Sequence, residues 1–100
     1  MYSINEIQKC LHKEMKTIKE KYHVKRLGIF GSYARNDNHE ASDIDILVKF
    51  KSTLSLLQLV HLERLISKEL GIKVDLVTEG AIKNKIVKEN ISKDLQIIFQ

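Results

Sequence analysis

Three short segments with alternating apolar side chains constrain the fold of this chain more than any other feature. In the clearest of them, residues 42–50, apolar side chains recur at every second position. These are Ile44, Ile46 and Val48, which alternate with Asp43, Asp45 and Leu47. Residues 72–78 repeat the alternation, and residues 25–30 form a shorter apolar stretch. Alternation with a period of two is typical of a β-strand with one buried face, so three strands are predicted.

Segments with helical spacing separate these strands. Over residues 4–22 apolar side chains recur at steps of three and four, behind a capping-box pair of Ser3 and Glu6. Helices are also predicted over residues 53–70, with Gly71 as the C-terminal cap, and over residues 81–90. Residues 96–99 are either a last extended segment or a packed tail. This order predicts an α/β (α+β) fold in which a small mixed β-sheet is covered by helices on one side.

The length and composition of the chain fit one cytoplasmic domain over residues 1–100. Cys10 is the only cysteine, so no intrachain disulfide can form, which suits a reducing compartment. No apolar run approaches the roughly 20 residues of a membrane span, and the N-terminus does not resemble a signal peptide. The net charge of +4 reflects 17 Lys and Arg against 13 Asp and Glu. It fits either an ordinary solvated surface or an attraction to phosphates.

Asp43 and Asp45 are the first candidates for chemistry. In a strand, residues two apart project to the same side about 7 Å apart, so the two carboxylates are expected to share a face. Like charges aimed at one place repel, and a divalent cation relieves the repulsion. Carboxylate oxygens favour magnesium or manganese. The alternative is that both are solvent-facing strand residues or turn caps.

Asp75 lies in the later segment, between Val74 and Leu76. A charged residue inside an apolar alternation is a poor choice for stability alone. If the two strands pair, Asp75 can face the same side as Asp43 and Asp45. The alternative is the exposed polar face of a half-buried strand.

Gly31 and Ser32 follow the first strand, where a helix is expected to open. Glycine permits close approach of a ligand to the backbone, and the free N–H groups at a helix start suit phosphate. The Ser32 hydroxyl adds a donor, and Arg35 could reach the phosphates as a fixed cation. The alternative is a plain turn with a serine cap.

Together these elements resemble the polymerase-beta-type nucleotidyltransferase superfamily. The segments GSYAR, SDIDILV and KVDLV, in that order, are similar to those of the small minimal nucleotidyltransferase (MNT) group, and the resemblance covers roughly residues 4–99. It implies the nucleotidyltransferase fold. In one position the chain departs from the family, because Asn36 stands where relatives usually have glycine. Asparagine tolerates left-handed torsions better than most residues, which suits the loop.

The resemblance also implies roles for the candidate residues. Asp43 and Asp45 would ligate two Mg²⁺ ions, or Mn²⁺ in their place. Asp75 would ligate the catalytic metal and help to activate the attacking hydroxyl. Gly31 and Ser32 would hold the β- and γ-phosphates of ATP, with Arg35 assisting.

Members of this group are antitoxins that transfer AMP to a tyrosine of a partner HEPN-domain ribonuclease toxin. The resemblance therefore implies a protein adenylyltransferase that forms a hetero-oligomer with a HEPN partner, with nucleic acid not expected as a direct ligand. One alternative is an antitoxin that neutralises its partner by binding without catalysis. Another is nucleotidyl transfer to a small molecule or an RNA end.

Overall fold

A four-stranded mixed β-sheet forms the centre of the protein, in a computed structural model that describes residues 3–39 and 41–100. The strand order is β3-β2-β1-β4. β1 pairs antiparallel with both of its neighbours, whereas β2 pairs parallel with β3. The strands are β1 (Val24–Phe30), β2 (Ile44–Phe50), β3 (Val74–Thr78) and β4 (Gln96–Phe99). The predicted mixed sheet is confirmed, and the C-terminal segment is an edge strand of it.

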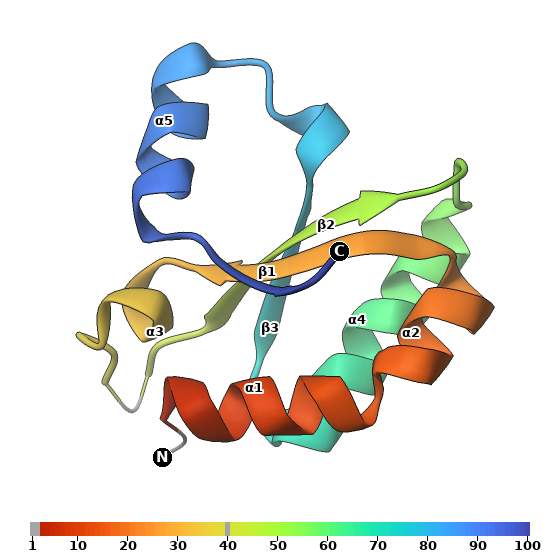
Figure 1. Cartoon of the computed structure of the whole chain (residues 1–100), viewed down its shortest axis with the longest axis horizontal. Coiled ribbons are helices and arrows are strands. Elements are labelled where there is room, and N and C mark those ends of the chain that lie inside the picture. The colour runs from red at the N-terminus through yellow and green to blue at the C-terminus, as the bar shows by residue number, and fades with distance from the viewer. Residues whose placement is uncertain (1–2, 40) are drawn as a thin grey trace.

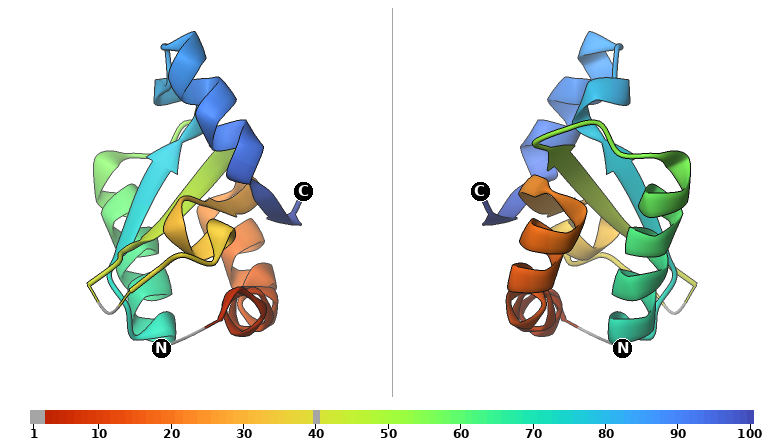
Figure 2. Two further views of the ribbon diagram at one scale, coloured as in Figure 1. Left: turned by 90° about the vertical axis from the view of Figure 1, so that its left-hand side faces the viewer. Right: turned by 90° about the vertical axis from the view of Figure 1, so that its right-hand side faces the viewer.

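Three helices cover one face of the sheet (Figures 1 and 2). They are α1 (Ile4–Lys13), α2 (Met15–Tyr22) and α4 (Leu56–Leu70). The apolar positions of β2 that point toward them are fully buried, and Ile44, Ile46 and Val48 have no exposed surface. They pack with helix residues such as Ile7 and Ile66 in one core. Because side chains alternate along a strand, Asp45 and Leu47 project from the other face, which we call the open face.

The stretch predicted as one helix over residues 4–22 is two helices that meet at Glu14. Glu14 is the C-terminal cap of α1 and also precedes α2, and its N–H still donates to the carbonyl of Cys10 at 3.2 Å. Apolar side chains on both sides of the break, among them Leu11 and Ile18, face the same core. The apolar spacing therefore continues through the break, and the spacing alone could not reveal it. The capping box of Ser3 and Glu6 is present as predicted.

The segment after β3 differs most from the sequence prediction. Instead of a helix over residues 81–90, a short 3-10 turn, η1 (Glu79–Ala81), is followed by α5 (Lys85–Asp94). The side chain of Asn84 accepts hydrogen bonds from the N–H groups of Ile86 and Val87, at 2.8 and 3.2 Å, and so fixes the start of α5. This cap shifts the helix four residues toward the C-terminus.

The ends of α4 follow local sequence signals. Ser55 and Gln58 form a reciprocal capping box at the start, so the helix begins at Leu56 rather than at the predicted residue 53. Gly71 ends it in the left-handed conformation, at φ 68°, as predicted. None of the helices in the described ranges has the length and apolar character needed to cross a bilayer.

Helix α5 is anchored against the open face at Gly28 of β1. A Cβ atom at this position would lie 2.6 Å from Cδ1 of Leu95, the residue that caps the C-terminus of α5. The missing side chain therefore makes room for Leu95 on the sheet. The rest of α5 extends away from the sheet (Figure 1) and has no fully buried residue.

Candidate active site

Asp45 lies in β2 between two strands that both contribute to the site. In the sheet register it stands opposite Phe30 of β1, the residue before Gly31, and opposite Asp75 of β3. Neighbouring strands are about 4.8 Å apart, and register partners point to the same face. The parallel pairing of β2 with β3 therefore places Asp45 and Asp75 side by side on the open face.

Asp43 completes a set of three nearby carboxylates. It comes directly before β2 and is half-buried, while Asp75 is exposed. Burial raises the pKa of the Asp45 carboxyl, and repulsion from the charges of Asp75 and Asp43 raises it further. The positive charge of Arg35 acts in the opposite direction. The charges of Asp43 and Asp75 thus both act on Asp45, at the end of β2 nearest Gly31.

The donors at this place suit a hard divalent cation. Within residues 3–39 and 41–100, no three His, Cys, Asp or Glu side chains are gathered closely enough to form a complete metal cage. Mg²⁺ does not require such a cage, because it is usually held by one or two carboxylates together with substrate phosphates and water. Asp45 is a half-buried carboxylate repelled by two others, and a bound divalent cation stabilises its ionised form. The residues present therefore fit Mg²⁺ that arrives with a nucleotide.

Gly31 brings the turn after β1 against Asp45. Its backbone has φ 75° and ψ −153°, a conformation essentially restricted to glycine. A Cβ atom at this position would collide with the carboxylate of Asp45. The helix that follows, α3 (Ser32–Arg35), has only four residues. Gly31 and Ser32 thus form a tight turn directly beside the acids.

Asn36 ends α3 in the left-handed conformation, with φ 62°. This is the conformation that favours glycine, so the expectation that asparagine would preserve the loop is confirmed in the backbone. The N–H of Asp37 donates to the carbonyl of Ser32 at 3.0 Å and closes the turn.

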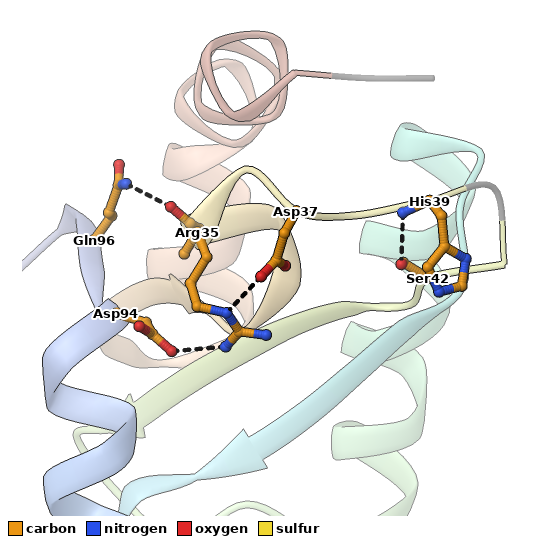
Figure 3. Close-up of polar contacts among 7 residues, drawn as sticks. Arg35, Asp37, His39, Ser42, Asp94 and Gln96 are labelled. Carbon is orange, nitrogen blue, oxygen red and sulfur yellow. Dashed lines mark hydrogen bonds and ion pairs between the residues drawn. The ribbon is translucent and has the colours of Figure 1, made fainter.

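Arg35 is held by two carboxylates (Figure 3). Its Nε donates to Asp37 at 3.0 Å, and its Nη1 donates to Asp94 of α5 at 2.8 Å. These hydrogen bonds, first that with Asp37 and then that with Asp94, raise the pKa of the guanidinium. Arg35 lies near enough to Asp45 to affect its ionisation. It is thus an anchored cation at the edge of the site, and these two contacts use only its Nε and Nη1.

Two further contacts support the residues of the site. Nε2 of Gln96 donates to the carbonyl of Ala34 at 3.2 Å, which ties β4 to α3 (Figure 3). The hydroxyl of Ser42 accepts from the N–H of His39 at 2.9 Å, and so braces the loop just before Asp43. Gln96 and Asp94 are about 60 residues from the turn that they support, and no local spacing reveals such pairs.

Comparison with known proteins agrees with the fold and with these motifs. The model of the family described as "Nucleotidyltransferase domain" matches residues 11–98. The chain therefore belongs to the nucleotidyltransferase domain family and is an enzyme of that class, as the sequence motifs predicted.

Two relatives of this chain are small proteins of about the same length. The chain is 55% identical to "Putative protein adenylyltransferase MJ0128" of Methanocaldococcus jannaschii, over 95% of this chain and 97% of that protein. It is 40% identical to "Protein adenylyltransferase MntA" of Thermococcus cleftensis, over 88% of this chain and 89% of the other. The predicted resemblance to minimal nucleotidyltransferases is thereby confirmed.

A solved structure shares the fold. The tri-AMPylated Shewanella oneidensis HEPN toxin in complex with MNT antitoxin aligns with a TM-score of 0.67 and 21% identity, over 93% of this chain and 71% of that chain.

Proposed function

We propose that this chain transfers AMP from ATP to a hydroxyl group of a partner protein, a tyrosine of a HEPN-domain ribonuclease toxin, and so acts as its antitoxin. The observation that carries the proposal is the register of Asp45 with Asp75 beside the Gly31 turn. Relatives of about the same length bear the name protein adenylyltransferase. A structural neighbour is described as an AMPylated HEPN toxin with its antitoxin. The name of the relatives supports a protein as the acceptor, and the description of the neighbour supports a HEPN toxin.

In this proposal the residues of the open face have separate roles. Gly31 and Ser32 hold the β- and γ-phosphates, and the guanidinium of Arg35 assists. Asp43, Asp45 and Asp75 would hold two Mg²⁺ ions, whose charge would neutralise the phosphates and lower the pKa of the acceptor hydroxyl. The Asp75 carboxylate, which is exposed, orients the acceptor hydroxyl.

The reaction exchanges one phosphorus–oxygen bond for another. The acceptor oxygen bonds to the α-phosphorus of ATP, the bond from that phosphorus to the β-bridging oxygen breaks, and pyrophosphate leaves. The proton of the acceptor hydroxyl passes to a carboxylate of the site. Placement and charge neutralisation supply most of the rate gain in such transfers.

The direct test is to incubate the chain with a HEPN-domain protein, ATP and Mg²⁺, and to weigh the partner by intact mass spectrometry. We expect the added mass of AMP, and peptide mapping should place it on tyrosine. Asp45→Asn keeps the shape of the side chain and removes its charge, so it should lower the transfer rate at least a hundredfold. Transfer by Asp45→Asn at the parent rate would contradict the site.

The same variant separates catalysis from neutralisation by binding alone. If the parent chain adds no AMP, and both the parent and Asp45→Asn inhibit the ribonuclease equally, the chain acts by covering its partner. If inhibition requires ATP and is lost in Asp45→Asn, transfer is the mechanism.

A further inference from the structure

A groove of about 1090 Å³ lies beyond the carboxylates, toward the far ends of β2 and β3. One wall is the segment from Lys51 to Leu56 together with Leu59 of α4. The other is formed by one side of α5 together with Thr78, Glu79, Gly80 and Ile82. We call it the β2 groove. None of Asp43, Asp45 and Asp75 lines it.

The β2 groove combines an aliphatic lining with cationic side chains. Leu47 and Lys49 of β2 lie in it, and Leu59, Ile91 and Leu95 contribute from the two walls. Four cations also line it, namely Arg26, Lys49, Lys51 and Lys88. Glu79 is the one acid among the lining residues. The groove therefore carries a clear excess of positive charge.

The single acid of the groove is already paired. Oε2 of Glu79 accepts from Nη2 of Arg26 at 2.8 Å. The buried Nε of Arg26 has no hydrogen-bond partner in the part of the chain that the structure describes. The Glu79 carboxylate thus satisfies only part of this guanidinium, while Lys49, Lys51 and Lys88 are exposed.

The β2 groove and the candidate active site share strand β2. Leu47, which lines it, is two residues after Asp45 and projects from the same face, a separation of about 7 Å. A peptide lying in the groove therefore has residues within reach of the carboxylates without further movement of the fold.

We propose that the β2 groove docks the acceptor protein, through an acidic amphipathic segment that leads to the modified hydroxyl. This inference rests on the proposed transfer to a protein. Its aliphatic side chains occupy the leucine and isoleucine surface, and its carboxylates pair with Lys49, Lys51 and Lys88. Leu56 in the groove wall is 77% exposed, and its neighbour Leu57, which is 65% exposed, extends the apolar contact beyond the groove.

The lining favours a protein segment over nucleic acid. Proteins that bind single strands stack the bases on several aromatic side chains, whereas Phe50 is the one aromatic residue that lines this groove. Leucine and isoleucine instead suit the aliphatic side chains of a peptide. Charge complementarity then selects acidic flanks, because opposed charges across an interface speed association and exclude wrong partners.

The test reverses charge at the groove rim without touching the candidate active site. Lys51→Glu and Lys88→Glu, singly and together, are compared with Lys16→Glu, an equal change at an exposed position of α2 on the covered side of the sheet. With a HEPN-domain protein as acceptor, the double variant should raise the acceptor KM at least tenfold and leave the KM for ATP unchanged. Lys16→Glu should alter neither value. Leu56→Ser tests the apolar contact and should raise the acceptor KM several-fold.

A binding measurement keeps this test independent of catalysis. In an Asp45→Asn background without ATP, calorimetry with the HEPN-domain protein should show weaker binding when Lys51 and Lys88 are reversed. If no AMP transfer is seen but this weakening is found, docking stands and the transfer proposal fails. If AMP is transferred with an unchanged acceptor KM in the rim variants, the docking proposal fails and transfer stands.

Two other outcomes would also overturn docking. A raised KM for ATP in the rim variants would assign the groove to the nucleoside. Binding of a short single-stranded RNA that the rim variants abolish, with binding of the HEPN-domain protein unchanged, would assign it to nucleic acid.

Discussion

Two glycines with positive φ show how differently a missing side chain can act. Gly71 caps α4 in open space, with no atom within 4 Å of where a Cβ would lie. Gly31 has a conformation that other residues essentially never adopt, and its missing Cβ leaves room for the Asp45 carboxylate. Gly71 is thus required only by the backbone conformation. Gly31 is required by its backbone conformation and also lets the turn after β1 lie against Asp45.

Replacing each glycine by alanine separates these effects. Gly71→Ala should lower the free energy of unfolding by about 1 kcal/mol, from backbone strain alone. Gly31→Ala should cost more than about 2 kcal/mol, because its conformation is worse for alanine and the added methyl group displaces Asp45. Urea unfolding measures both. Only Gly31→Ala should also reduce AMP transfer at protein concentrations where both variants are folded. Equal losses of stability and full activity in Gly31→Ala would contradict the contact.

The pKa of Asp45 predicts a pH-dependent gain in stability for Asp45→Asn. A carboxyl whose pKa is raised by folding binds its proton more tightly in the native state, so its ionisation destabilises the fold. The penalty is absent below the ordinary value of 3.8 and is complete once the pH exceeds the raised value. In EDTA near pH 7, Asp45→Asn should therefore have a Tm a few degrees above the parent. The difference should shrink toward zero as the pH falls below 3.8. A Tm of Asp45→Asn below that of the parent at pH 7 would contradict the repulsion.

Cys10 is expected to be a slow nucleophile. Burial, followed by the negative charges of Glu69 and Glu14, raises the pKa of its thiol. Since the thiolate is the reactive form, less of it is present at pH 8 than in a free thiol. Iodoacetamide should label the native chain more slowly than glutathione at that pH, whereas the urea-unfolded chain should react at a similar rate to glutathione. Labelling of the native chain at the glutathione rate would contradict this assignment.

At the scale of elements, the strands could be predicted from the sequence because alternation reports burial directly. Ile44, Ile46 and Val48 are buried as their spacing indicated. Helix boundaries depend on caps and on backbone breaks that apolar spacing does not record. Asn84 shifted α5, and Glu14 divided the first helix. Asp43, Asp45 and Asp75 could be chosen from the sequence as candidate site residues. The ion pair of Arg35 with Asp94 could not, because it depends on how α5 packs against α3.

The Asn84 cap gives a prediction for α5. Asn84→Ala removes the acceptor for two N–H groups and should cost about 1 kcal/mol of helix stability. Because α5 carries Asp94, its loosening should also free Arg35, which hydrogen exchange can follow in α5 and α3. Ser3→Ala removes the comparable cap of α1 and should leave exchange in α5 unchanged. Unchanged protection of α5 in Asn84→Ala would show that tertiary contacts alone set its start.

In the molecule as a whole, the apolar core and the candidate active site lie on opposite faces of one sheet. The face under α1, α2 and α4 holds the apolar core, the open face holds the acids, and the β2 groove lies between the open face and the start of α4. Changes on the open face can therefore alter binding without removing core contacts.

This division predicts unequal effects of similar truncations in α4. Ile66 is 1% exposed, so Ile66→Ala should lower the free energy of unfolding by about 2–5 kcal/mol, a large share of what a domain this small possesses. Leu57 is 65% exposed, and Leu57→Ala should change it by less than about 0.5 kcal/mol. Chemical denaturation measures both. Comparable losses would show that the exposed leucine surface is part of the core.

The crossover through α4 between the parallel strands β2 and β3 has a consequence for synthesis on the ribosome. A nascent chain that ends at Leu70 already contains the turn at Gly31 and two of the acids, yet it lacks Asp75 and the strand that carries it. A chain whose translation stops before Asp75 cannot bring Asp45 and Asp75 together. The third carboxylate joins the other two only when α4 has folded back and β3 has docked beside β2.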